Sequence, residues 1–142
     1  MKTRYSSLVT VKKSAVQKSE QEVQKKNAEL KSADEALELA YTTLYDITTP
    51  HDGVVANFLT TQALLHTARA QIKHNKEWQN FAKDQLQLAK DNLKKDMIEY
   101  EKFHYLELEE IKKLLVAQAK LEAKELDEIA LMSYANRIIG DK

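Results

Sequence analysis

The chain has 142 residues, of which 31% are charged, and its 22 basic and 22 acidic residues give a formal net charge of zero. This balance argues against a nucleic-acid partner, and the absence of cysteine excludes disulfide and thiol chemistry. No stretch approaches the roughly 18 apolar residues of a membrane span, and the N-terminus lacks the apolar core of a signal peptide. We therefore expect a cytoplasmic protein made of long helices or coiled coils.

A seven-residue repeat of aliphatic residues runs through the first part of the chain. Its first position is aliphatic six times in succession, whereas its second position is mixed. Such a repeat is typical of a coiled coil, in which polar seam residues cost stability but help to specify register. It predicts a first helix over about 4–48, looser in its N-terminal half. The first positions are Val9, Val16, Val23, Leu30, Leu37 and Leu44, and the second are Tyr5, Lys12, Ser19, Lys26, Ala33, Ala40 and Ile47.

A short break follows this helix. Pro50 is the single proline of the chain, and Gly53 is one of its two glycines. Thr49 is a residue type that caps helix N-termini, and Pro50 and Asp52 would then lie in the first turn. Asp52 could instead cap a helix that begins at Gly53. Both alternatives predict a turn over about 49–53, and short links favour antiparallel helices.

The same repeat returns in a second helix predicted over about 54–139, with Gly140 as its C-terminal cap. After Tyr100 the apolar residues change phase and resume at Leu108, Leu115 and Ile129, with Ile111 and Leu126 beside them. Before that point the first positions are Phe58, Leu65, Ile72, Gln79, Leu86, Leu93 and Tyr100, and their companions are Ala68, Asn75, Ala82, Ala89, Asp96 and Phe103.

The predicted fold class is all-α: two long helices in an antiparallel coiled-coil hairpin, the second much longer than the first, in a single domain over 1–142. With a turn centred near residue 51, residue i would face a residue near 102 − i, so that Tyr5 faces Met97. Glu101–Ile139 would then have no partner within the hairpin, although it is rich in large apolar residues. Such a segment favours association, either with a second copy of the chain or with a different protein.

The residues that could carry chemistry form no complete site. Glu101 and His104 have the Glu-x-x-His spacing of helical di-iron proteins, but those sites need a second such pair and two further glutamates. His66 and His74 are too far apart on one helix to share a ligand. We therefore expect no catalytic residue, no metal and no cofactor, and a protein that is not an enzyme.

Aromatic residues near the turn allow two interpretations. Tyr41 and Tyr45 lie four residues apart and so share a helix face. They could pack at the hairpin tip against Phe58 or Leu65, or they could form an exposed contact for a partner. Trp78 and Phe81 could fill the space beside the polar Gln79, opposite Val23 and Lys26, or could anchor a partner.

The two-helix layout, the unequal arms, the Tyr41-x-x-x-Tyr45 pair and the stretch Glu125-Leu126-Asp127-Glu128-Ile129-Ala130 resemble the flagellar export protein family FliJ. The resemblance implies a cytoplasmic coiled-coil stalk or chaperone, peripheral at the flagellar type III export apparatus. It implies binding to the export ATPase, FliI, to the export gate membrane protein, FlhA, and in some cases to export chaperones. By this resemblance, Tyr41 and Tyr45 would meet the gate. The ATPase-binding residues would be Leu108, Leu115, Leu126, Asp127, Glu128 and Ile129.

Two alternatives stay open at this stage. The related stalk protein of virulence-type secretion systems has the same shape. A structural coiled-coil homodimer without a role in secretion would bury the C-terminal segment against its own copy.

Overall fold

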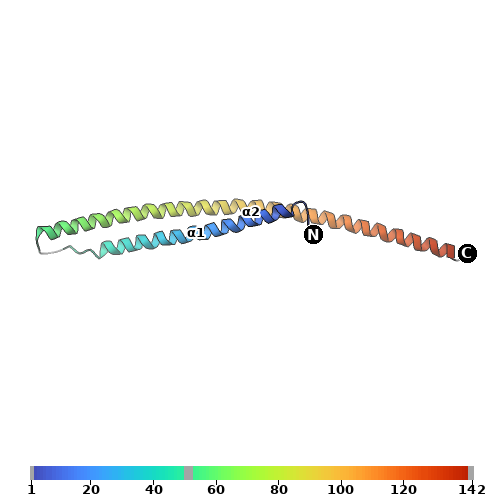
Figure 1. Cartoon of the computed structure of the whole chain (residues 1–142), viewed down its shortest axis with the longest axis horizontal. Helices are drawn as coiled ribbons and strands as arrows, with labels where there is room; N and C mark the ends of the chain where they lie inside the picture. The colour runs from blue at the N-terminus through green and yellow to red at the C-terminus, as the bar shows by residue number, and fades with distance from the viewer. Residues whose placement is uncertain (1, 50–52, 141–142) are drawn as a thin grey trace. The chain divides into compact units, whose positions relative to one another are not determined.

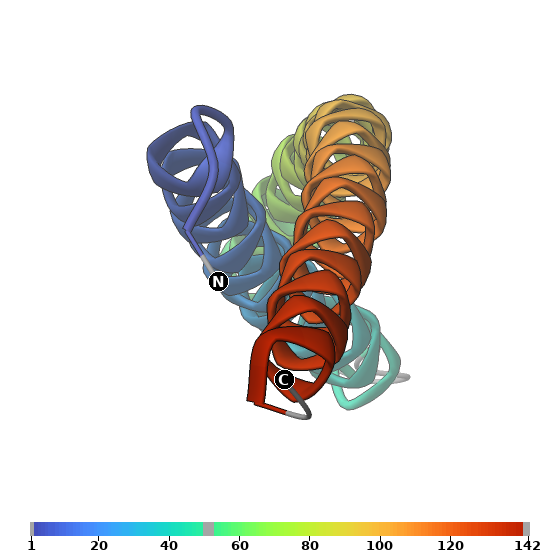
Figure 2. The same cartoon turned by 90° about the vertical axis from the view of Figure 1, so that its right-hand side faces the viewer.

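The computed structural model describes residues 2–49 and 53–140, and it contains two helices. Helix α1 spans Ser6–Tyr45 and has 40 residues, whereas α2 spans Val55–Gly140 and has 86. Both views show helices and no strand over the described residues (Figures 1 and 2). The predicted fold class is confirmed: the chain is all-α, and a short helix packs antiparallel against a longer one.

The chain divides into two compact units, one made of Met1–Lys13 and Ile98–Lys142 and the other of Ser14–Met97. In the second unit the predicted seam forms the core. Leu37 and Ala40 of α1 pack with Ile72 of α2, and Tyr41 and Leu44 pack against this cluster. Alanines make up much of the remaining buried surface, and they let the two helices approach closely because they are small. The buried apolar residues are Ala33, Leu37, Ala40, Ala68, Ile72, Ala82, Leu86 and Ala89.

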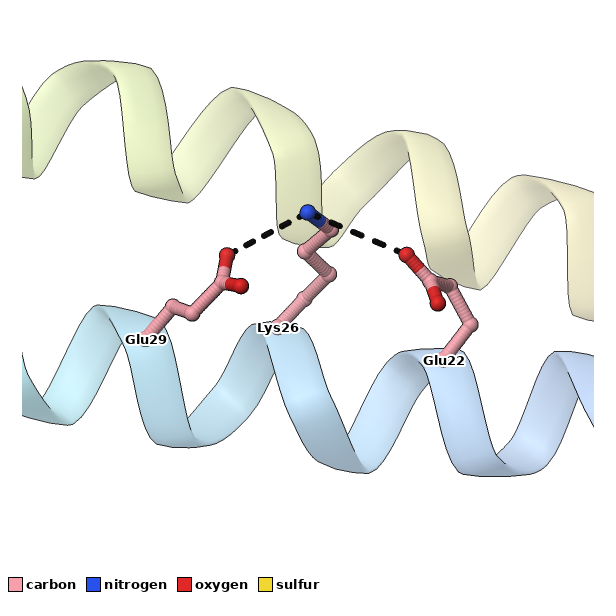
Figure 3. Close-up of polar contacts among 3 residues, drawn as sticks. All are labelled: Glu22, Lys26 and Glu29. Atoms are coloured by element: carbon pink, nitrogen blue, oxygen red, sulfur yellow. Dashed lines mark hydrogen bonds and ion pairs between the residues drawn. The ribbon is translucent and has the colours of Figure 1, made fainter.

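Lys26 is a charged residue in this mostly apolar seam. Its side chain is only 19% exposed and reaches toward α2 (Figure 3). Two carboxylates of α1 hold its ammonium group, that of Glu22 at 3.8 Å and that of Glu29 at 3.2 Å. The spacings of three and four residues place all three side chains along one side of the helix. The pairs thus partly offset the cost of removing the ammonium group from water.

Contacts between the helices define an antiparallel register that differs from the predicted one. Within Ser14–Met97, the Asn75 side chain donates from Nδ2 to the carbonyl of Ala36 at 3.2 Å. Gln79 donates from Nε2 to the Asp34 carboxylate at 2.6 Å. The residue numbers of these partners add to 111 and 113, whereas the predicted value was near 102. The predicted register is therefore wrong by about ten residues, or roughly 15 Å along the helix.

The link between the helices accounts for this shift. Helix α1 ends at Tyr45, where Asp46 N–H still donates to the Thr42 carbonyl at 3.0 Å, and α2 begins at Val55. By the observed register, Tyr45 lies level with residues near 67 of α2, roughly 18 Å from Val55 along the helix. The residues 46–54 that join the helices can span roughly 30 Å when extended, so the link is long enough.

The sequence signals for the turn lie inside this link. The β-branched run Ile47-Thr48-Thr49 has low helix propensity, which favours the end of α1 before it. Thr49 is in the link and not in the first turn of α2, where the carbonyl of Val54 accepts from Asn57 N–H at 2.9 Å. Pro50 and Asp52, which were predicted to start or cap the second helix, lie outside the described residues.

At its N-terminus α1 begins with a capping box. Tyr5 N–H donates to Thr3 Oγ1 at 3.1 Å, and Thr3 N–H donates to Ser6 Oγ at 2.8 Å. The Ser6 hydroxyl then donates to the Glu107 carboxylate of α2 at 3.2 Å. The same side chain therefore caps α1 and joins it to α2 within the unit of Met1–Lys13 and Ile98–Lys142.

Two ion pairs also join the N-terminal segment to α2 in this unit. Arg4 lies 3.8 Å from Glu110, and Lys12 lies 3.8 Å from Glu99. Glu107 and Glu110 follow Tyr100 and Phe103 by seven residues each, so the surface that faces α1 keeps its heptad phase beyond Tyr100. The predicted phase slip is therefore wrong for the contacting surface. The seam positions become acidic there, and the exposed Leu108 points away from the seam.

Candidate partner-binding surfaces

A long apolar segment at the end of α2 is exposed. Every described residue from Lys112 to Gly140, here called the C-terminal arm, is exposed. Phe103, Leu106 and Ile111 are half-buried, because residues 2–13 pack on this part of α2. The predicted unpaired segment therefore begins at Lys112 and not at Glu101. The large exposed apolar residues of the arm are Leu114, Leu115, Val116, Leu121, Leu126, Ile129, Leu131, Met132, Tyr134, Ile138 and Ile139.

Most of these residues gather on two sides of the helix. Successive residues of an α-helix are about 100° apart, so residues seven or eighteen positions apart lie within roughly 20° of each other. Leu108, Leu115 and Leu126 share one side in this way, and Ile129 lies about 60° from Leu126. We call these four residues the outer face. All four are exposed, Leu126 to 66%.

The second side continues the seam that α1 occupies earlier in α2. Counting in sevens from Tyr100 leads to Leu114 and Leu121, and counting from Phe103 leads to Leu131 and Ile138. We call these four residues the seam face, and all four are exposed. Sequence reasoning missed this face as a site, although the unbroken heptad from Phe58 onward was the signal for it.

The predicted ATPase-binding residues are therefore not all on one side of the helix. Leu126, Asp127, Glu128 and Ile129 are consecutive, so they point in four directions around α2. Leu126 and Ile129 belong to the outer face, together with Leu108 and Leu115. Asp127 lies to one side of it, and Glu128 lies in line with the seam face. A partner that docks along the outer face would thus contact the leucines and Ile129 more readily than Glu128.

The tyrosine pair before the link combines one half-buried and one exposed ring. The rings of Tyr41 and Tyr45 stack with centroids 6.5 Å apart and planes at 20°. Tyr45 is 77% exposed, so the predicted packing of this ring at the hairpin tip is wrong. The ammonium group of Lys76 lies 5.7 Å from the Tyr41 centroid. Hydrogen bonding and charge interaction with the Tyr41 hydroxyl raise the pKa of Lys76.

Three other aromatic residues are not where packing arguments placed them. Phe58 is exposed, which fits the observed register because α1 ends level with residues near 67 of α2. Trp78 and Phe81 are also exposed, so they do not fill the space opposite Lys26. Gln79 instead bonds to Asp34 across the two helices.

His104, which has metal-ligand spacing from Glu101 in the sequence, lies beside an aromatic ring. His104 stacks on Tyr100, with ring centroids 5.6 Å apart and planes at 10°. Within residues 2–49 and 53–140, no three acidic or histidine side chains lie close enough together to hold a metal ion. The fourth histidine of the chain, His51, lies outside that part. Neither described helix is long and apolar enough over its described residues to cross a membrane.

A short helix packed antiparallel on a longer one, with an exposed apolar arm, defines a coiled-coil protein whose surface is suited to binding other helices. The chain also matches the family model described as "Flagellar FliJ protein" over residues 1–138. It therefore belongs to the FliJ family of coiled-coil components of flagellar protein export. A search of curated proteins and a search of solved structures each found no significant match.

Proposed function

We propose that this chain is a non-enzymatic stalk and adaptor of the flagellar export apparatus, located in the cytoplasm, and that its C-terminal arm docks on the export ATPase. The observation that carries this proposal is the outer face, an exposed row of large aliphatic side chains in a FliJ-family chain. Burial of one such side chain contributes about 1.5–3 kcal/mol, so four together contribute about 6–12 kcal/mol against the cost of association.

The arm and the turn of α2 before it, which carries Leu108, bind as a helix laid into an apolar groove, with the outer face as the anchor residues. Residues seven positions apart reach successive pockets of the groove, as Leu108 and Leu115 would. Asp127 lies at the edge of this face and is suited to a rim contact with a basic residue of the ATPase. Rim charges mainly affect association rates and specificity.

The tyrosine pair is the proposed contact for the export gate, an FlhA-like membrane protein. Tyr45 supplies an exposed aromatic surface, and its stacking on Tyr41 restricts its rotamers before binding. Aromatic residues held in this way make strong interface anchors because little conformational entropy is lost on contact. Export chaperones are a further class of partner that family membership suggests.

A pair of matched variants tests the ATPase contact. Leu126→Asp places a charge in the outer face, whereas Leu121→Asp makes the same change on the seam face at similar exposure, 66% against 58%. We expect Leu126→Asp to weaken association with purified export ATPase at least about tenfold, and Leu121→Asp to change it little. Both variants should keep the helical circular dichroism of the parent. Equal loss by both variants, or by neither, contradicts docking through the outer face.

A further inference from the structure

The four residues of the seam face belong to a heptad seam of eight positions along the arm. The order of residue types in this seam is the same when it is counted from either end. Its heptad positions between Lys112 and Gly140 alternate large apolar, small, large apolar and charged residues, and then repeat in reverse. The midpoint of the order falls at Leu126, which is also the midpoint of the exposed arm. In chain order the positions are Leu114, Ala117, Leu121, Lys124, Glu128, Leu131, Ala135 and Ile138.

We propose that the seam face pairs with the seam face of a second copy of this chain, in an antiparallel coiled coil centred on residue 126. In that arrangement the residue numbers of facing positions add to 252. Each layer then joins two residues of matching size or opposite charge. The layers are Leu114 with Ile138, Ala117 with Ala135, Leu121 with Leu131, and Lys124 with Glu128, and each occurs twice by symmetry.

Continuity with the interface between α1 and α2 supports a helix as the occupant. The seam face uses the same heptad positions of α2 that contact α1 and its preceding residues earlier in the helix. There, Glu107 accepts a hydrogen bond from Ser6, and Glu110 forms an ion pair with Arg4. That interface also alternates aliphatic residues with alanines. A second helix on the arm would therefore continue the same packing, with the same close approach at the alanine layers.

Charge decides both the orientation and the register of the two copies. In a parallel, in-register pair, Lys124 would face Lys124 and Glu128 would face Glu128, and like charges in a seam are destabilising. An antiparallel pair shifted by one heptad places Glu128 against Ala117 or Leu131 and leaves its charge without a partner. Centring on residue 126 joins lysine to glutamate in both central layers.

Pairing through the seam face leaves the outer face accessible. The outer-face residues Leu108, Leu115 and Leu126 lie on the side of α2 opposite the seam heptad. The inference therefore does not rest on the proposed ATPase contact, and either can fail without the other. If both hold, one arm can contact a second copy and another protein at the same time.

The test uses the full chain alone, in sedimentation equilibrium over a wide concentration range. We expect a monomer–dimer equilibrium. Lys124→Glu should raise the dissociation constant about tenfold or more, because Glu then faces Glu128 in two layers. The double variant Lys124→Glu/Glu128→Lys should restore the dimer, because it exchanges the two charges. A chain that stays monomeric at every concentration, or a double variant no better than the single one, overturns the proposal.

The relative orientation of the two copies is tested by cysteine crosslinking. The chain has no cysteine of its own, so only the introduced cysteines react. Leu121→Cys and Leu131→Cys variants are mixed and treated with a short bis-maleimide reagent. The antiparallel pair predicts a crosslink in the mixture and little in either variant alone. Efficient crosslinking of each variant with itself would show a parallel dimer and overturn the proposed arrangement.

Discussion

Asn75 of α2 donates its side-chain amide to the backbone carbonyl of Ala36 in α1, at 3.2 Å; Asn75 is a seam residue, and Ala36 directly precedes the seam residue Leu37. Asn75 is buried, and its Oδ1 accepts from Gln71 at 3.4 Å. A polar side chain with such a partner favours one alignment of the helices, because any shift leaves a buried amide without its hydrogen bond. This contact is the clearest determinant of the observed register.

Removal of this amide should therefore reduce stability. Asn75→Ala is expected to lower the free energy of unfolding by about 1–2 kcal/mol, since a buried hydrogen bond and its packing are lost. Asn75→Leu should be less destabilising but should permit other registers. Urea unfolding measures the first effect, and distances between spin labels on α1 and α2 measure the second. A single sharp distance in Asn75→Leu would show that other layers fix the alignment.

Lys26 should reduce stability relative to an aliphatic residue at the same place. Its aliphatic stem packs in the seam, but its ammonium group is kept partly out of water by the neighbouring helix and held by Glu22 and Glu29. Lys26→Leu is expected to raise the free energy of unfolding by roughly 1 kcal/mol, because an apolar residue suits this position better. Thermal unfolding followed by circular dichroism gives the comparison. A lower melting temperature for Lys26→Leu than for the parent chain would contradict this interpretation.

The N-terminal part of α1 should depend on salt. Ser6 donates a hydrogen bond to Glu107 of α2, and two partly exposed ion pairs join Arg4 to Glu110 and Lys12 to Glu99. Exposed pairs contribute little each and are screened by salt. Amide hydrogen exchange in residues 7–13 should speed up several-fold at high salt, whereas exchange in residues 33–40 should change little. Equal salt effects in the two segments would show that the ion pairs do not hold this end.

Tyr41 should control the titration of Lys76. Hydrogen bonding and charge interaction with the Tyr41 hydroxyl raise the Lys76 pKa, so Tyr41→Phe should lower it toward the ordinary value for lysine. A raised folded-state pKa adds stability that is present below the unfolded value and is lost as pH rises through the folded value. The loss of this stability is therefore confined to strongly alkaline pH, near 10.5 and above. An NMR titration of Lys76 in both proteins measures it, and identical curves would contradict the contact.

The heptad pattern predicted most of the fold. The two helices, their order and the residues of the seam followed from the spacing of Val, Leu and Ala, because a seven-residue repeat dictates which side of a helix is buried. Within the described part of the chain, even the polar Lys26 and Asn75 occupy the seam as the repeat predicted.

The register could not be derived in the same way. A heptad repeat allows several alignments that differ by whole heptads, and the choice among them depends on the length of the link and on contacts such as Asn75 with Ala36. The error in register carried over to the site. It placed Phe103 and Leu106 in the unpaired segment. The predicted phase slip after Tyr100 was a separate error, and it concealed the seam face.

The central claim is that the arm Lys112–Gly140 is a docking surface that the rest of the chain leaves uncovered. Hydrogen exchange measured by mass spectrometry tests it most directly, on the dilute chain alone and with the purified export ATPase. We predict fast exchange across the arm in the chain alone, and slow exchange there, but not in residues 33–40, once the ATPase is added. An arm already as protected as residues 33–40 in the chain alone, or one unchanged by the ATPase, would contradict the account.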